Sequence, residues 1–466
     1  MPTPSPLDDP TLDALRDALR GPVLAPGDDG YDAARTVWNA RLSSRPAAVA
    51  RCTGAADVRT AVDIARENDL SLSVKGGGHS YAGRSAAEDA LMVDLSPMTG
   101  VRVDPGAKTA QAQAGTTWGA FDHEAQAFGL ATTGATVSTV GVAGCTLGGG
   151  TGHLARKCGL SLDNLISADV VTADGSFVHA SEDENADLFW GLRGGGGNLG
   201  VVTSFEFQLH EVGPEVLAGQ ILHPMADATE GLRLYRDVMA NAPDALQAYA
   251  FFVHAPPIPA VPEAYHGQTV LDFVVTYAGD PSTGEEVLRP LRAFGDPILD
   301  AVRPQPYTAL QQTFDEGVPP GQRWYSKAHY LDALPDAALD TVVEHVDPLP
   351  GPFSMVYFEP MGGAIGRVDP SATAFPHREA AYGFHILTGW SDPDQDADIM
   401  DWTRDVHAAM TPYANGGVYV NLLDSDEAPR VASAYGPNHG RLARLKDQYD
   451  PNNLFRENHN VEPAAA

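Results

Sequence analysis

The stretch Val74-Lys75-Gly76-Gly77-Gly78-His79-Ser80-Tyr81-Ala82-Gly83 decides the fold of this chain. Three consecutive glycines leave the backbone bare, so a ligand can approach the main-chain N–H groups closely. Just before them, Leu70, Leu72 and Val74 alternate with serines, which predicts a strand that ends at the glycines. By itself the pattern is equally compatible with a tight turn that carries a surface histidine.

Two more glycine clusters follow, at residues 141–152 and 193–203. After them the chain contains only isolated Gly-Gly pairs. This asymmetry predicts a first domain over residues 1–212 and a second over residues 213–410. The polar, Pro-rich start, residues 1–6, is expected to be loose.

The hydrophobic periodicity indicates the elements between these clusters. Val58, Ala61, Val62 and Ala65 lie at helical spacing and predict a helix at 55–68, which with the strand that leads to His79 is expected to form a β-α-β unit. Other segments of the first domain predict helices at 9–19 and 117–128, and strands at 91–95, 168–172, 177–180 and 205–209. The second domain predicts an α+β pattern with strands at 250–253, 271–277, 354–359 and 382–387, and helices at 227–241 and 398–410.

The charge balance limits the class of partner. The chain has 61 acidic and 30 basic residues, and the net charge is −31. The acid is spread along the chain, which argues against nucleic acid or an anionic membrane as partner. It fits adaptation to concentrated salt, with an ordinary acidic protein as the alternative.

The cysteines and the apolar runs give three further expectations. Three cysteines without Cys-x-x-Cys spacing indicate neither a disulfide framework nor a metal site. No signal peptide and no membrane-spanning run is visible. A cytoplasmic location is therefore expected.

Three interpretations compete for the glycines. Gly195-x-Gly197-x-x-Gly200 matches the dinucleotide fingerprint, but a strand pattern follows it where a helix is required. A P-loop needs Gly-Lys-Ser/Thr, which is absent. The third interpretation is a pyrophosphate held by several backbone N–H nests, without the help of a helix dipole.

At this point the chain resembles a known family, the FAD-linked oxidases of the berberine bridge enzyme type, within the vanillyl-alcohol oxidase (PCMH) fold. The resemblance covers nearly the whole chain. It rests on residues 75–81, 141–150, 156–164, 189–198 and Tyr449-Asp450-Pro451-Asn452-Asn453-Leu454-Phe455 with Asn458 and Asn460. It implies an α+β protein: a PCMH-type FAD-binding domain of two α/β subdomains, a substrate domain with an antiparallel sheet, and a C-terminal segment, 411–466, that returns to the FAD domain.

The resemblance also implies FAD as the cofactor, bonded covalently to His79. A neutral imidazole is a competent nucleophile near pH 7. The implied cofactor-binding residues are Lys75, Gly76, Gly77, Gly78, His79, Ser80, Val140, Gly141, Gly144, Cys145, Gly148, Gly149, Gly152, His153, Gly197, Asn198, Gly200, Val201, Val202, Tyr419 and Asn421. Many family members carry a second link through a cysteine, but that position is Val137 here, so a single link is expected. Cys145 is expected to be a small buried residue or to line the cofactor.

The family reaction is hydride transfer from a small organic substrate to flavin N5, with reoxidation by dioxygen to peroxide. A dehydrogenase with another electron acceptor is the alternative, and a non-catalytic flavin-binding protein is a third possibility. The usual base is a tyrosine after a Tyr-x-Asn segment, but Tyr419-Val420-Asn421 is followed by Leu422. Sugars and simple alcohols are therefore expected to be poor substrates.

Other groups are candidates for the chemistry in place of that base. The catalytic candidates are Tyr81, His385, Tyr419 and Asn421. Tyr357 and Glu359 share one face of their own strand, but the sequence does not say whether that face meets the pocket. Residues 375–378 are interpreted as structural.

Overall fold

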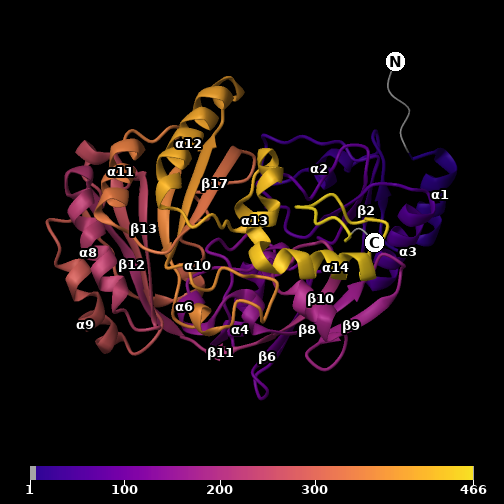
Figure 1. Cartoon of the computed structure of the whole chain (residues 1–466), viewed down its shortest axis with the longest axis horizontal. Helices are drawn as coiled ribbons and strands as arrows, with labels where there is room; N and C mark the ends of the chain where they lie inside the picture. The colour runs from indigo at the N-terminus through magenta and orange to yellow at the C-terminus, as the bar shows by residue number, and fades with distance from the viewer. Residues whose placement is uncertain (1–6, 465–466) are drawn as a thin grey trace.

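The computed structural model describes residues 7–464, so the expected loose start at residues 1–6 lies outside the described part. Figure 1 shows two lobes side by side along the longest axis. One lobe carries two sheets built mainly from the first 212 residues, and the other carries a single wide sheet. Within residues 7–464 no helix is long and apolar enough to cross a membrane.

The first sheet delivers the loop that carries His79. Its strands, in spatial order, are β1 (Val23–Leu24), β2 (Ala48–Arg51), β4 (Leu91–Asp94) and β3 (Leu72–Lys75). The last three are parallel, as a β-α-β connection requires. Helix α3 (Ala55–Glu67) buries the predicted apolar stripe, so the β-α-β prediction is confirmed. Nearby are α1 (Asp9–Ala18) and α2 (Tyr31–Arg35).

The second sheet is antiparallel, and the third glycine cluster leads directly into its central strand. Its order is β5 (Val101–Asp104), β6 (Thr109–Gln113), β10 (Val201–Gln208), β8 (Leu165–Val171) and β9 (Phe177–Ser181). A strand, β10, does follow the third glycine cluster, which confirms the rejection of the dinucleotide fingerprint. The accompanying helices are α4 (Trp118–Gln126), α5 (Val142–Gly148), α6 (Ala155–Cys158) and α7 (Ala186–Leu192). A short pair, β7 (Leu130–Ala131) and β11 (His210–Glu211), closes this lobe.

The third sheet is antiparallel throughout and has eight strands. Its order is β15 (Leu299–Asp300), β12 (Glu215–Pro224), β14 (Thr269–Tyr277), β13 (Leu246–His254), β18 (Met355–Pro360), β19 (Tyr382–Trp390) and β17 (Arg323–Leu331), and β16 (Arg303–Pro306) also pairs with β12. The four strands predicted for this domain are present, and each is longer than its apolar run. Strands β12 and β17 were not among them.

Strand alternation gives this sheet two different faces. Phe252, Phe358 and Phe384 point to one side, into a core shared with four helices that cover that face in Figure 1. The helices are α8 (Ala228–Ala240), α9 (Pro281–Arg292), α11 (Asp336–Val346) and α12 (Asp396–Met410). The intervening Phe251 and Leu387 belong to the core of the FAD lobe. The face of the sheet that these four helices leave uncovered therefore packs toward the FAD lobe and its glycine clusters.

The C-terminal segment lies against the first lobe. Helices α13 (Val431–Tyr435) and α14 (His439–Tyr449) cross that lobe in Figure 1. The fully buried Lys446 donates to Asp450 at 2.6 Å and to the carbonyl oxygens of Asn198 and Phe455 at 2.9 and 2.8 Å. A buried ammonium needs such partners, because leaving it unpaired would cost several kcal/mol. This lysine therefore ties the third glycine cluster to the C-terminal turn.

Candidate active site

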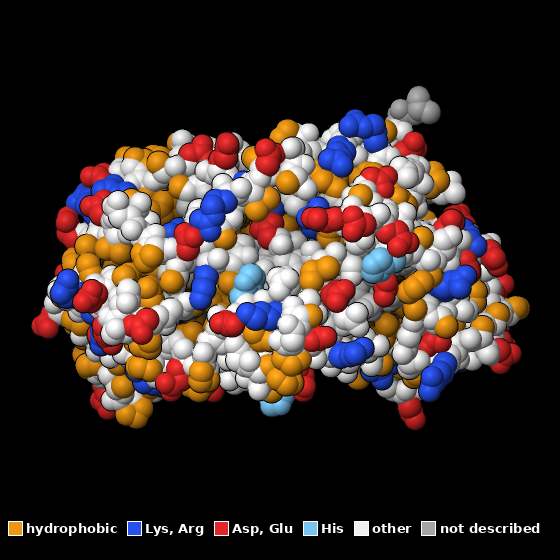
Figure 2. All heavy atoms as spheres, turned by 90° about the horizontal axis from the view of Figure 1, so that it is seen from below, with side chains coloured by type: hydrophobic (Ala, Val, Ile, Leu, Met, Phe, Trp, Pro, Cys, Tyr) orange, Lys and Arg blue, Asp and Glu red, His pale blue; other side chains and the backbone are white. Residues whose placement is uncertain are grey.

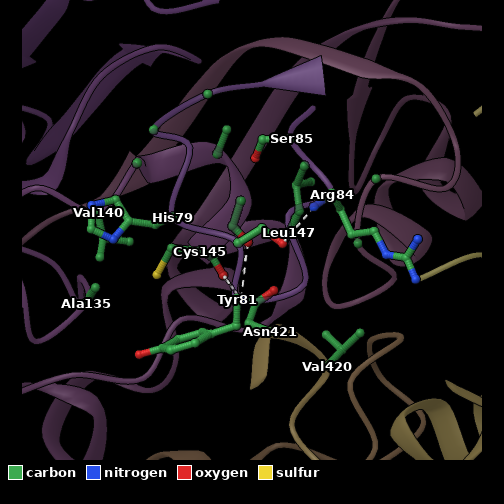
Figure 3. A pocket seen from close by; sticks show the side chains of 18 of the residues that line it. His79, Tyr81, Arg84, Ser85, Ala135, Val140, Cys145, Leu147, Val420 and Asn421 are labelled. Atoms are coloured by element: carbon green, nitrogen blue, oxygen red, sulfur yellow. Dashed lines mark hydrogen bonds between the residues drawn. The ribbon is translucent and has the colours of Figure 1, made fainter. Parts of the chain in front are cut away.

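A single large cavity lies where the three glycine clusters meet the uncovered sheet face. Figure 3 shows part of its lining, with His79 and Val140 on one side and Arg84 on the other. Seventeen of the predicted site residues line it: Gly76, Gly77, Gly78, His79, Ser80, Tyr81, Val140, Gly141, Gly144, Cys145, Gly197, Asn198, Gly200, Val201, Val202, Tyr419 and Asn421. Residues far apart in the sequence thus converge on one cavity.

The loop from Gly76 to Tyr81 has the character of an anion cradle. None of its backbone N–H groups donates a hydrogen bond to the protein within residues 7–464. A Cβ on Gly77 would lie 2.4 Å from the nitrogen of Gly141, so the first two clusters touch backbone to backbone. A Cβ on Gly144 would meet nothing within 4 Å, which leaves this part of the cradle open. Unpaired N–H donors beside bare glycines fit a pyrophosphate.

The second glycine cluster differs from the expectation in one respect. Residues 142–148 form the short helix α5, so the cradle is not made of loops alone. The helix is possible because Val142, Cys145 and Leu147 are apolar and pack on the core, whereas Gly144 between them faces the open cavity. The prediction of nests without any helix is wrong at this cluster.

His79 projects into the cavity from the first cluster (Figure 3). Its Nε2 lies 3.1 Å from the Oγ1 of Thr139, and its ring stacks on Trp38 with 5.0 Å between the ring centroids. The other ring nitrogen, Nδ1, has no hydrogen-bond partner among the described residues. Burial lowers the pKa of His79 to about 4, so the imidazole is neutral at pH 7 and keeps a free lone pair.

Unlike His79, the cysteines do not offer a reactive nucleophile to the cavity at neutral pH. Cys145 lines the cavity, but burial raises the pKa of its thiol to about 11. The thiolate is the nucleophilic form, so this sulfur is unreactive at neutral pH. Val137, at the position of the second link in the family, lines the cavity with an inert side chain, and Cys158 does not line it.

Tyr419 and Asn421 line the cavity from a 3-10 turn, Val420–Leu422, which Tyr419 precedes directly. The turn is closed by the N–H of Leu422, which donates to the carbonyl of Tyr419 at 3.0 Å. The Tyr419 hydroxyl accepts from the N–H of Gly150 at 2.9 Å and from the Asn421 amide at 3.0 Å. With both lone pairs engaged, this hydroxyl presents its proton as a donor.

The opposite wall is apolar and aromatic apart from one carboxylate. Phe251 and Tyr357 stack with 4.4 Å between centroids, and Met355, Leu387 and Phe314 complete the wall. Glu359 lies among them and is only 3% exposed. The wall therefore offers a water-poor pocket in which Glu359 is the carboxylate available for acid-base chemistry.

His385 supports Glu359 from behind. Its Nε2 lies 3.1 Å from Oε2 of Glu359. Glu359 pairs across the strands with Gly383, and a Cβ there would lie 2.5 Å from Nε2 of His385. Glycine at this position therefore gives the imidazole room to reach the carboxylate.

Comparison with known proteins agrees with this geometry. A family model described as "FAD binding domain" matches residues 46–181, and one described as "Berberine and berberine like" matches residues 418–462. The (R)-6-hydroxynicotine oxidase of Paenarthrobacter nicotinovorans is 31% identical, over 96% of this chain and 97% of its own. An FAD-linked oxidoreductase of Dictyostelium discoideum is 30% identical over 96% of both chains. The chain belongs to the FAD-linked oxidases of the berberine bridge enzyme type.

The fold comparison supports the same assignment. A solved structure of a chitooligosaccharide oxidase superposes with a TM-score of 0.87 at 27% identity, and the match covers 98% of this chain and 100% of that one. The expected α+β fold with a PCMH-type FAD domain and an antiparallel substrate-domain sheet is confirmed. The protein is an FAD-dependent oxidase.

In this oxidase three glycines of the second cluster that were predicted to bind the cofactor do not line the cavity. They are Gly148, Gly149 and Gly152. A Cβ on Gly148 would lie 2.2 Å from Oδ1 of Asn421, and one on Gly149 would lie 2.8 Å from the ring of Tyr419. These glycines let the 3-10 turn pack closely. Their predicted contact with the cofactor stays a prediction.

Lys75, His153 and His385 also stand outside the cavity lining of the oxidase. Lys75 donates to the carbonyl of Ala34 at 2.6 Å and pairs with Asp94, so it anchors the base of the first loop. His153 is buried and stacks on Phe314. The structure therefore gives Lys75 and His153 packing and anchoring contacts, and the predicted cofactor roles of these two residues and the catalytic role of His385 stay predictions.

Sequence reasoning missed several lining residues of the oxidase. They include Trp38, Arg84, Leu95, Phe251, Phe314, Val318, Tyr435 and His459. No motif marked them, because each reaches the cavity through the packing of separate elements. Glu359 was the exception, since its strand face was visible in the sequence.

Proposed function

We propose that the oxidase removes a hydride from a carbon next to an amine nitrogen, or from the benzylic carbon of a phenol, and returns the electrons to dioxygen. The observation that carries this proposal is the buried Glu359 in an aromatic, apolar wall that faces the cradle. An aromatic amine or phenol fits such a wall by stacking and by cation–π contact. An oligosaccharide would leave most of its hydroxyl groups without partners.

Each group of the site has a separate role in this reaction. Bound FAD supplies the two-electron acceptor for the hydride. Glu359 takes the proton from the substrate N–H or O–H as the C–H bond gives up its electron pair. His385 fixes the carboxylate, the aromatic wall excludes water, and the Tyr419 hydroxyl is available to donate a hydrogen bond into the site.

We also propose that the flavin is attached to His79 alone. Support comes from the neutral imidazole with a free Nδ1, the protonated Cys145 thiol, and valine at position 137. The relatives differ in what their names say they oxidise: one oxidises 6-hydroxynicotine and another chitooligosaccharides. We therefore infer the substrate class from the aromatic, apolar wall of this chain's cavity.

A substrate panel tests the proposed class. Cyclic aromatic amines and 4-alkylphenols are expected to give peroxide with kcat/KM at least about 100-fold above that for xylobiose or chitobiose, because unpaired sugar hydroxyls lose affinity at this wall. Peroxide release under air is the measurement. Sugars that turn over as fast as the best amine or phenol would refute the proposed substrate class.

Salt adaptation is a further proposal, supported by the net charge of −31. Figure 2 shows Asp and Glu side chains spread over the face of the molecule and not gathered in one patch. Below about 1 M salt the Debye length exceeds about 3 Å, and repulsion between these charges grows. We expect the unfolding temperature to fall steadily as KCl is removed by dialysis. An unchanged unfolding temperature in dilute buffer would contradict salt adaptation.

A further inference from the structure

A second, smaller cavity lies where the two lobes join, between α4 and the short helix α10 (Tyr307–Gln311). Figure 1 shows these helices near each other at the junction. The cavity is lined by Gly119, Asp122, His123, Ser138, Thr308, Gln311 and Gln312. It is separate from the flavin cavity, and nothing in the oxidase reaction uses it.

The carboxylate of Asp122 has no partner. Its residue is 1% exposed, and neither Oδ1 nor Oδ2 receives a hydrogen bond within residues 7–464. No Lys, Arg or His of the described chain forms an ion pair with it. Some other buried carboxylates are paired with cations, Asp163 with Arg378 and Asp450 with Lys446, whereas the buried Asp272 accepts from the amide of Gln220 and has no cationic partner among the described residues. A buried charge without a counter-charge is strongly unfavourable, and burial raises the pKa of Asp122 well above its usual range, so this carboxyl must hold either a proton or a cation.

The other unpaired atoms near Asp122 are also oxygens. Oε1 of Gln311 is buried without a partner, and the amide cannot simply turn over, because its Nε2 donates to the carbonyl of Ala135. The hydroxyl of Tyr307, on the same helix, is buried and unpartnered as well. The Tyr307 hydroxyl can donate as well as accept, whereas Oε1 of Gln311 and an ionised Asp122 carboxylate can only accept. Oxygen ligands around one negative charge are the surroundings that a hard cation prefers.

We propose that this cavity binds one monovalent cation, K⁺ or Na⁺, through the carboxylate of Asp122 and the side-chain oxygen of Gln311. A single charge matches a single carboxylate. A divalent ion is disfavoured, because no group of three or more His, Cys, Asp or Glu side chains that could hold a metal exists in residues 7–464.

The site would stabilise the loop behind the flavin cavity. Gln311 holds the carbonyl of Ala135, and Ser138 donates its N–H and its hydroxyl to Asp315 at 2.9 and 2.6 Å. Thr139, next in the loop, contacts His79. A cation at Asp122 therefore fixes α10 against α4 and, through them, the wall on which Ala135, Val137 and Val140 line the flavin cavity.

The test measures the unfolding temperature of the holoenzyme in KCl, NaCl and choline chloride at one ionic strength. We expect K⁺ or Na⁺ to raise the unfolding temperature above the choline value by about 2–4 °C, because a ligand of the native state stabilises it by mass action. Asp122→Asn should remove this difference. Asp17→Asn, at an exposed aspartate, is the matched control and should keep it.

Equal temperatures in all three salts, or the same difference in Asp122→Asn as in the wild type, would overturn the proposal. If Asp122→Asn does not fold, a wild-type crystal soaked in rubidium chloride decides. An anomalous peak between Asp122 and Gln311 supports the site, whereas its absence at that position overturns it. This outcome is independent of general salt adaptation, which responds to ionic strength and not to one residue.

Discussion

Replacing Glu359 by glutamine is expected to lower the rate of flavin reduction by about 10²–10⁴-fold, the usual contribution of a general base. The change keeps the size of the side chain and removes its ability to accept a proton. Glu359 is the carboxylate of the aromatic wall and is held by His385 at 3.1 Å. The measurement is stopped-flow absorbance of the flavin after anaerobic mixing with the best substrate of the panel.

A matched variant separates this effect from a general loss of structure. Glu263→Gln changes an exposed glutamate of the same lobe and should leave the rate unchanged. The yellow colour and the unfolding temperature of Glu359→Gln should stay close to those of the wild type, because the amide can still contact His385. A Glu359→Gln enzyme that reduces its flavin at the wild-type rate would exclude this carboxylate as the base.

The second large effect concerns attachment of the flavin. Acid-precipitated wild-type protein should remain yellow, whereas the pellet of His79→Ala should be colourless with its FAD in the supernatant. The reason is that His79 follows directly on the first glycine cluster and is neutral at pH 7, with a pKa lowered to about 4 by burial, whereas the Cys145 thiol is protonated. Absorbance of the pellet and of the supernatant after trichloroacetic acid treatment gives the answer directly.

Cys145→Ser is the control for this experiment, because Cys145 is the cysteine that lines the cavity. Its pellet should stay as yellow as that of the wild type. A colourless wild-type pellet would disprove covalent attachment. A flavin found on a cysteine-containing peptide by mass spectrometry would disprove the single link.

The sequence predicted the fold well where local patterns carry it. Alternation of apolar residues marked β13, β14, β18 and β19, whose alternate side chains pack on two different cores. It failed for β17, because Ser326 and Lys327 interrupt the apolar run. Both side chains are buried, and each donates a hydrogen bond to a residue far along the chain: Ser326 to the carbonyl of Leu422, and Lys327 to the carboxylate of Asp426. Such pairing is not visible in a local window.

For the site, the glycine clusters identified the cradle but not the role of each glycine. Gly77 and Gly148 look alike in the sequence, yet one contacts another loop at the cavity and the other makes room for Asn421. Whether Glu359 or His385 lies at the cavity depends on the strand register. The two residues lie on neighbouring strands and face the same side, and only their pairing across Gly383 places the carboxylate in front. The sequence therefore named both residues, but it could not say which of the two side chains reaches the cavity.

The most direct test of the central claim is reduction of the flavin by substrate without oxygen, followed by admission of air. The holoenzyme is mixed anaerobically with the best amine or phenol while the visible flavin band is recorded. We predict that the band bleaches, and that air restores it with release of an equivalent amount of peroxide. A band that no amine or phenol bleaches, or one that stays bleached in air and recovers only with another electron acceptor, would contradict the account.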